Sequence, residues 1–237
     1  MHSILNKIKI FADGADFQGM LDMASKPYIS GLTTNPTLMR KAGISNYTQF
    51  AIDVLKEIKE KPISLEVFSD DLDEMILQGK KISSWGDNVY VKIPITNTKG
   101  ESTKSVIQQL VNSKIKVNIT AIMTESQVTE IFEVLDSKVP SYISVFAGRI
   151  ADTGRDPMPL MSNVVKLVSH NSSAEIIWAS PRELLNIYHA AETGCHIITA
   201  TNDILKKLEL DGKDLDEYSL ETVKMFYEDA KQSGYTL

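Results

Sequence analysis

The sequence is poor in cysteine and has no long apolar run. Cys195 is the single cysteine among 237 residues, so the chain can form neither an internal disulfide nor a cysteine-rich zinc site. No segment approaches the ~18 consecutive apolar residues of a membrane-spanning helix. The first residues also lack the apolar core of a secretory signal. These absences predict a cytoplasmic protein that makes no membrane contact.

Positive charge is scarce relative to negative charge. The chain has 25 lysines and arginines against 31 aspartates and glutamates, a net charge of -6. Proteins that bind nucleic acid usually present a basic face, so nucleic acid is not an expected partner. The glycine-rich nucleotide-binding motifs are missing, and the four histidines show no metal-ligand spacing. These absences argue against the use of nicotinamide cofactors or ATP and against a histidine metal site.

Short apolar or β-branched runs recur along the chain, and helical spacing follows most of them. The runs span residues 8–13, 28–34, 63–68, 88–94, 115–120, 142–147, 175–180 and 195–200. Helix candidates include residues 45–61, 70–84, 103–113, 126–135, 160–169, 181–193 and 203–207. Strands that alternate with helices form parallel sheets through right-handed crossovers. Eight regular units favour an α/β fold of the closed (β/α)₈ TIM-barrel type over a doubly wound open sheet.

The end of the chain adds one more amphipathic segment. Residues 215–231 carry apolar side chains at helical spacing within an otherwise acidic tail. We expect residues 1–237 to form a single barrel domain in which residues 209–237 are a C-terminal helical extension.

Polar residues gather where the predicted strands end, which is the end of a TIM barrel that carries the functional site. Those residues are Asp13, Thr33, Thr34, Asn35, Glu66, Lys92, Asn118, Thr120, Ser144 and Arg149. Any one of them could instead satisfy a backbone group or cap the next helix. Polar residues on so many strands together favour a binding or catalytic site.

Lys92 is the most informative of these residues, because it interrupts the apolar run NVYVKIPIT. A lysine in a buried strand must reach solvent, pair with a carboxylate such as Glu66 or Asp13, or lose its proton. An amine made neutral by desolvation can attack a carbonyl and form a Schiff base. Asp13 and Glu66 could then move the protons of the reaction, while Thr120 and Asn118 could hold a water or sugar hydroxyls.

Six segments resemble the successive strand motifs of the transaldolase family, especially its small, short-chain members. They are FADGAD, GLTTNPTL, SLEVFSDD, VYVKIP, VNITAI and ISVFAGRI, and the resemblance extends from Phe11 to about Thr201. It implies a class I, Schiff-base transferase of the pentose phosphate pathway that needs no metal and no organic cofactor. The substrates would be sugar phosphates, and the small members of the family imply a homo-oligomeric ring.

The resemblance assigns catalytic roles to four residues. Lys92 would form the Schiff base, and Asp13 would act as the acid/base in carbon–carbon bond cleavage. Glu66 would act through a water held by Thr120.

The resemblance also assigns substrate contacts. Asn35 and Asn118 would bind hydroxyls of the dihydroxyacetone unit, with Thr33 beside them. Ser144 and Arg149 would hold polar groups of the substrate, and Arg149 corresponds to the family's anion-binding arginine.

A related activity in the same family is fructose-6-phosphate aldolase, which cleaves the ketose and releases dihydroxyacetone. In that group a glutamine replaces the third-strand carboxylate, and a tyrosine precedes the arginine by three residues. Here these positions are Glu66 and Phe146, which favours transfer over cleavage.

The seventh strand departs from the family pattern. The positions that help to bind phosphate fall on Ile177, Trp178 and Ala179. Ser180 and Arg182 could substitute, with the start of the following helix adding backbone N–H donors. The substrate could therefore end in a phosphate held differently or in a sulfonate or other anion. A barrel that binds a sugar anion without turnover is the non-enzymatic alternative.

Overall fold

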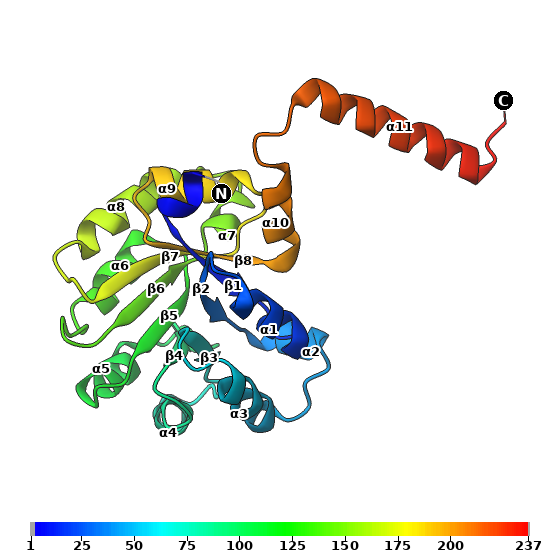
Figure 1. Ribbon diagram of the computed structural model, residues 1–237. Helices are drawn as coiled ribbons and strands as arrows, with labels where there is room; N and C mark the ends of the chain where they lie inside the picture. Colours follow the sequence, from blue (N-terminus) through cyan, green and yellow to red (C-terminus); the bar gives the residue numbers. More distant parts are fainter. Residues whose placement is uncertain (1–2, 237) are drawn as a thin grey trace. The chain divides into compact units, whose positions relative to one another are not determined.

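The barrel predicted from the sequence is confirmed. In the computed structural model, which describes residues 3–236, eight parallel strands close into a barrel in chain order (Figure 1). The strands are β1 (Lys9–Asp13), β2 (Ile29–Thr33), β3 (Ile63–Glu66), β4 (Val89–Pro94), β5 (Val117–Ile122), β6 (Ser141–Val145), β7 (Ala174–Trp178) and β8 (Ile197–Thr201). β1 pairs with both β2 and β8, which closes the ring.

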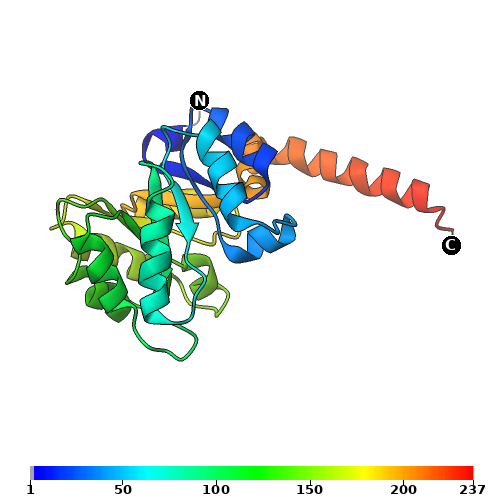
Figure 2. The same ribbon diagram turned by 90° about the horizontal axis from the view of Figure 1, so that it is seen from below.

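Helices lie outside the ring of strands, as the two views in Figures 1 and 2 show. The helices of the barrel are α1 (Phe17–Ser25), α2 (Pro36–Lys41), α3 (Tyr47–Glu57), α4 (Leu72–Ser83), α5 (Lys104–Asn112), α6 (Glu125–Phe132), α7 (Ala147–Ala151), α8 (Met158–Val168), α9 (Leu185–Glu192) and α10 (Asn202–Lys206), preceded by the 3₁₀ helix η1 (Ser3–Asn6). α1, α2 and α7 were not among the predicted helices. Within residues 3–236 no helix is both long enough and apolar enough to cross a membrane.

Polar caps begin several of these helices just after a strand ends. The Asn35 side chain accepts from Leu38 N, and Pro36 occupies the first turn of α2, where a missing N–H costs nothing. Thr124 and Gln127 form a capping box at the start of α6. These caps fix the points at which the chain leaves the barrel mouth.

The amino-terminal half of the barrel interior is filled by apolar and aromatic side chains. Phe11, Tyr90 and Tyr142 form a buried cluster with residues of β7 and β8. A Cβ at Gly31 would lie 2.6 Å from the Phe11 ring, so glycine makes room for that ring inside the barrel. Asp13, Lys92 and Ser144 follow these aromatic residues by two positions, so they share the inward face one layer closer to the carboxyl ends.

The chain divides into two compact units, one ending at Leu205 and the other beginning at Lys206. The second unit contains the 3₁₀ helix η2 (Lys207–Leu210) and α11 (Leu215–Ser233), whose extent agrees with the predicted tail helix. Asp214 caps α11 by accepting from Asp216 N and Glu217 N, and Gly234 ends it in the left-handed conformation. α11 has no buried residue.

Candidate active site

The carboxyl ends of the strands surround a cavity of about 550 Å³. Eleven of the twelve residues predicted to act or bind there line it: Asp13, Thr33, Asn35, Glu66, Lys92, Thr120, Ser144, Phe146, Arg149, Ser180 and Arg182. The twelfth, Asn118, does not line the cavity and is fully buried. Strands distant in sequence thus bring the predicted residues to one place.

Lys92 lies inside the barrel with only 6% of its surface exposed, so it does not reach solvent. Its Nζ donates to the Thr34 carbonyl at 2.7 Å and lies 3.1 Å from Glu66 Oε2. Glu66 and Lys92 are register partners on β3 and β4, which explains their proximity. The ion pair that the sequence left open is therefore present, and it joins the candidate nucleophile to a candidate proton acceptor.

Asp13 begins a short chain of hydrogen bonds at the ends of β1, β2 and β8. Thr33 Oγ1 donates to Asp13 Oδ1 at 2.7 Å and lies 2.6 Å from Thr199 Oγ1. Burial raises the pKa of the Asp13 carboxyl above its ordinary value, and the Lys92 charge and the Thr33 hydrogen bond only partly oppose that shift. A carboxyl with a raised pKa holds its proton more readily, as a group that both accepts and returns a proton should.

Thr120 and Ser144 lie on β5 and β6 at the same cavity. Ser144 Oγ donates to Asn118 Oδ1 at 2.7 Å, and Asn118 Nδ2 donates to Ser64 Oγ at 2.9 Å. Asn118 therefore orients Ser144 from behind the cavity wall. Thr120 Oγ1 is buried and has no hydrogen-bond partner within the described residues, so its hydroxyl is available to a group in the cavity.

A local irregularity in β5 shapes this wall. Ala121 has a φ of 62°, and the pairing of β5 with β6 shifts register between Ile119 and Ile122. An extra residue of this kind lets Thr120 and Ala121 both line the cavity, while Ile122 is fully buried. Left-handed backbone at an alanine is strained, and such strain concentrates at functional sites.

Cationic side chains stand at the β6 and β7 side of the cavity. The Arg149 guanidinium lies 5.7 Å from the centre of the Phe146 ring and has no hydrogen bond within residues 3–236. Arg182 is bound differently: Nε donates to Asp152 Oδ1 at 2.9 Å, and Nη2 donates to Asp152 Oδ2. Its Nη1 donates to the Ser180 hydroxyl at 3.0 Å. Arg182 thus reaches the cavity with most of its donors already engaged.

A glycine brings these two groups of residues together. A Cβ at Gly148 would lie 1.6 Å from the Ser180 carbonyl oxygen, a distance that only glycine permits. Ser180 itself adopts a left-handed φ of 62°. The close contact joins the start of α7, which carries Arg149, to the loop that carries Ser180 and Arg182.

Thr199 and Lys41 are two of the cavity residues that were not predicted from the sequence. Thr199 looked like an ordinary β-branched strand residue, and Lys41 looked like an ordinary lysine in a last helical turn. Both line the cavity. Arg155, in the loop after α7, is exposed, donates to Thr153 Oγ1 and does not line the cavity. Only its position in the fold identifies Lys41 as a cavity lysine.

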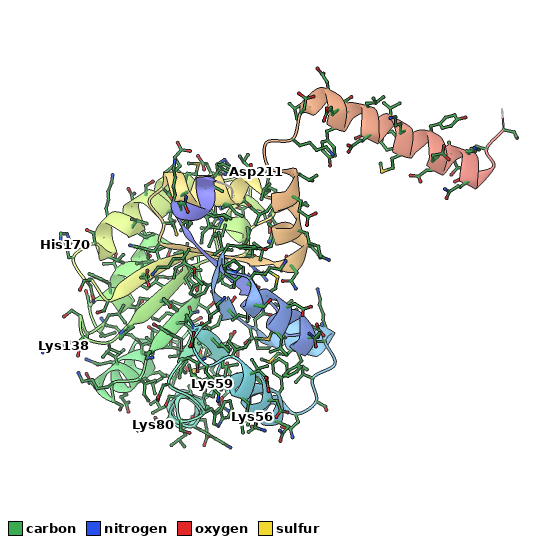
Figure 3. The ribbon with its side chains drawn as sticks, viewed as in Figure 1. Lys56, Lys59, Lys80, Lys138, His170 and Asp211 are labelled. Atoms are coloured by element: carbon green, nitrogen blue, oxygen red, sulfur yellow. The ribbon has the colours of Figure 1, made fainter. Side chains whose placement is uncertain are left out.

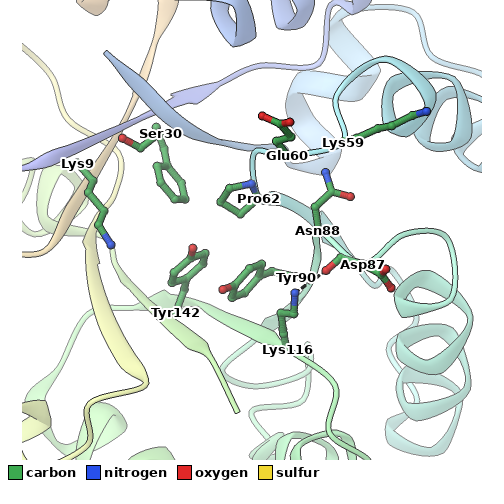
Figure 4. A pocket seen from close by; sticks show the side chains of 11 residues that line it. Lys9, Ser30, Lys59, Glu60, Pro62, Asp87, Asn88, Tyr90, Lys116 and Tyr142 are labelled. Carbon is green, nitrogen blue, oxygen red and sulfur yellow. Dashed lines mark hydrogen bonds between the residues drawn. The ribbon is translucent and has the colours of Figure 1, made fainter. Parts of the chain in front are cut away.

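A second cavity of similar size, about 510 Å³, lies at the opposite end of the barrel (Figure 4). The rings of Tyr90 and Tyr142 stack there with centroids 4.0 Å apart, and Lys116 donates to the Asp87 carbonyl. Burial raises the pKa of both tyrosines. Lys9 pairs with Glu175 at 2.8 Å. This cavity lacks a buried, strand-borne lysine beside two carboxylates, so its chemistry differs from that at the carboxyl ends.

Comparison with known proteins identifies the family of the chain. The profile of the Transaldolase/Fructose-6-phosphate aldolase family matches residues 10–237. The chain belongs to this family. Over 203 residues it is 32% identical to a probable transaldolase of Herpetosiphon aurantiacus, with 85% of this chain and 87% of that protein covered. It is 34% identical to a probable transaldolase of Streptococcus equi subsp. zooepidemicus, with 85% and 90% covered.

Solved structures with little sequence similarity share the fold of this transaldolase family member. An N-acetylneuraminate lyase from Mycoplasma synoviae superposes with a TM-score of 0.51 at 12% identity, covering 96% of this chain and 82% of that one. A putative lyase/mutase from Burkholderia cenocepacia gives a TM-score of 0.58 at 11% identity, covering 96% and 84%. Identities this low support the barrel fold alone.

The next question is whether the described residues could hold a metal ion. Within residues 3–236 no group of three or more histidine, cysteine, aspartate or glutamate side chains is placed to hold a metal ion. The titratable groups of the cavity are therefore two carboxylates and basic side chains.

Proposed function

We propose that the protein is a class I transaldolase that transfers a dihydroxyacetone unit from an anionic ketose to an aldose through a Schiff base on Lys92. The observation that carries this proposal is the burial of Lys92 between Glu66 and the end of β2, in the cavity that also holds Asp13. Membership in the transaldolase family supports the same chemistry.

The first half of the reaction follows from the positions of these groups. Lys92 gives up a proton, and its nitrogen adds to the ketose C2 carbonyl to form a carbinolamine. Loss of the carbinolamine oxygen as water leaves an iminium ion. Glu66, which contacts the amine, is the group closest to these proton transfers, and the Thr120 hydroxyl is placed to hold the water involved.

Carbon–carbon cleavage requires a base at the C4 hydroxyl. Asp13 accepts that proton while the C3–C4 bond breaks and its electron pair moves into the iminium ion, which becomes an enamine. The aldose fragment leaves and an acceptor aldehyde enters. The enamine attacks the acceptor, Asp13 returns the proton to the new hydroxyl, and water releases the product ketose from Lys92.

Substrate contacts are proposed for the surrounding polar residues. Thr33 and Asn35 would bind hydroxyls of the three-carbon unit, and Ser144, oriented by Asn118, would do the same from the other wall. Phe146 would pack against the sugar chain beside Arg149.

Transfer and simple cleavage are separated by product analysis. With a ketose phosphate donor and an aldehyde acceptor, we expect a new ketose and very little free dihydroxyacetone, and Lys92→Met should abolish both products. Free dihydroxyacetone that forms at the same rate with and without acceptor would instead establish the aldolase reaction. A Lys92→Met variant that keeps the biological effect of the wild type would favour a sugar-anion-binding barrel.

The terminal anion is the second part of the proposal. Arg182 is already paired with Asp152, so the site does not offer two free arginines to the terminal anion. The anion is identified by comparing donors that end in phosphate, in sulfonate or in an uncharged group. We expect kcat/KM to be higher for the two anionic donors than for the uncharged donor. Comparing kcat/KM for the phosphate and the sulfonate donor then shows which anion the site prefers.

Cellular context is proposed from family membership: a cytoplasmic enzyme of the pentose phosphate pathway that acts without a cofactor as a homo-oligomer. In α11 the large apolar side chains of Leu215, Val223, Phe226 and Tyr227 are exposed, which fits burial against another copy. Size measurement with and without the residues after Glu209 tests assembly, and an unchanged oligomer after truncation would exclude α11 from it.

A further inference from the structure

Three cations line the candidate active site besides Lys92, and they differ in how they are engaged. Arg182 is held by both carboxylate oxygens of Asp152 and by Ser180. Arg149 and Lys41 have no hydrogen bond or ion pair within residues 3–236, so their charges remain available to a ligand.

Lys41 is placed at the cavity by the geometry of α2. The Asn35 cap and Pro36 start this helix at the end of β2, and Thr37, Leu38 and Lys41 all line the cavity. Residues three and four positions apart share a helix face, so Lys41 projects from the face that Thr37 and Leu38 turn toward the site.

The surroundings of Lys41 give its side chain room to move. A side cavity of about 420 Å³ adjoins the main one and shares Asp13, Leu38 and Lys41 with it. Lys41 therefore lies on the border of two hollows, where a flexible four-carbon stem can carry an ammonium group toward a bound anion.

We propose that Lys41 is a specificity-determining residue that binds the anionic end of the substrate from the β2 wall, opposite Arg149 on the β6 wall. This inference rests on the proposed function and deepens it, because it assigns the anion to a pair that does not include Arg182. Lys41 and Arg149 are the two cations of the cavity, apart from Lys92, that make no hydrogen bond or salt bridge within residues 3–236; Arg149 stacks on Phe146, and its charge also acts on Asp152. A phosphate or sulfonate bound between them would replace no hydrogen bond and no salt bridge of these two side chains.

The first test is direct binding, which does not depend on Schiff-base chemistry. Glycerol 3-phosphate, an unreactive phosphate-bearing probe, is titrated into the wild type and into Lys41→Met, with glycerol as the uncharged control. Lys41 is exposed, so solvent screening weakens its interaction with a bound phosphate relative to a buried charged hydrogen bond. We therefore expect the Kd of Lys41→Met for glycerol 3-phosphate to be roughly tenfold higher than that of the wild type. Lys41→Arg should restore most of the affinity.

The matched control is Lys80→Met. Lys80 is an exposed lysine on α4 (Figure 3) that does not line the active cavity, and its ammonium has no partner within residues 3–236. Lys80→Met removes one positive charge from the protein surface, as Lys41→Met does. Lys80→Met should therefore bind glycerol 3-phosphate as the wild type does.

The second test is kinetic. The ratio of kcat/KM for glyceraldehyde 3-phosphate to that for glyceraldehyde should fall roughly tenfold in Lys41→Met, through KM rather than kcat. An unchanged Kd and an unchanged ratio would overturn the role of Lys41, as would an equal loss with both acceptors. Failure of the proposed function gives a different result. Borohydride reduction of the wild-type protein in the presence of a donor would then trap no imine, while phosphate binding would still depend on Lys41.

Discussion

Replacing Gly148 with alanine perturbs the site through the backbone. The new methyl group would lie 1.6 Å from the Ser180 carbonyl oxygen and 2.6 Å from its carbon, whereas real Cβ contacts are essentially never shorter than 3.0 Å. The two segments must then separate by about 1.4 Å, from 1.6 Å to 3.0 Å. Because the obstacle is backbone rather than a flexible side chain, the cost should reach the upper end of overpacking, about 3 kcal/mol.

The assay for Gly148→Ala combines thermal unfolding with kinetics. A loss of about 3 kcal/mol lowers Tm by about 6–12 °C in a protein of this size. KM for anionic substrates should rise, because α7 and the Ser180–Arg182 loop carry the cations of that wall. Gly14→Ala is the control, since a Cβ at Gly14 meets nothing within 4 Å. Wild-type Tm and KM in Gly148→Ala would refute the contact between these segments.

Two further substitutions test the strain and burial within the site. Asp13→Asn should raise Tm at neutral pH while abolishing turnover. The pKa of Asp13 is higher in the folded than in the unfolded protein, so its contribution to stability is fully present only below the unfolded-state pKa and is lost as pH rises through the folded-state pKa. The Tm difference should shrink toward pH ~4, and calorimetry that finds no gain at neutral pH would contradict this reasoning. Ala121→Val should cost about 1–3 kcal/mol in denaturant unfolding, because a β-branched residue tolerates the left-handed φ poorly; an unchanged midpoint would exclude strain there.

The sequence predicts the fold well because the barrel depends on local patterns. Each strand is a short apolar run, and each outer helix buries an apolar stripe, so alternation alone fixes the architecture. Lys92 and Glu66 could be predicted to lie together for the same reason, since neighbouring strands in a parallel barrel place their carboxyl ends side by side. Three helices were missed: α1, with nine residues, and α2 and α7, whose six and five residues give little periodicity.

Long-range side-chain contacts could not be predicted in the same way. Arg182 pairs with Asp152, thirty positions away, and nothing in either local sequence indicates that pairing. Asn118 was predicted to contact substrate, but its depth in the barrel depends on how Ser64 and Ser144 pack around it. Lys41 and Thr199 enter the cavity only because α2 and β8 fold against the same opening.

The buried charged groups that the proposed reaction needs lower the stability of the folded protein. A buried carboxylate and a buried ammonium each lose hydration, and their mutual attraction offsets that loss only in part. The free energy of unfolding should therefore increase when both groups of the pair are replaced by neutral residues of similar shape, even though activity is lost. Such behaviour is typical of functional sites.

The most direct test of the account is to trap the imine. Wild-type protein is incubated with dihydroxyacetone or a donor ketose phosphate, reduced with borohydride and digested, and the modified peptide is sequenced by mass spectrometry. We predict one reduced three-carbon adduct per chain, on Lys92, and none in Lys92→Met. An unmodified Lys92 in the presence of a donor that the enzyme turns over, or an adduct on another lysine, would contradict the proposed mechanism.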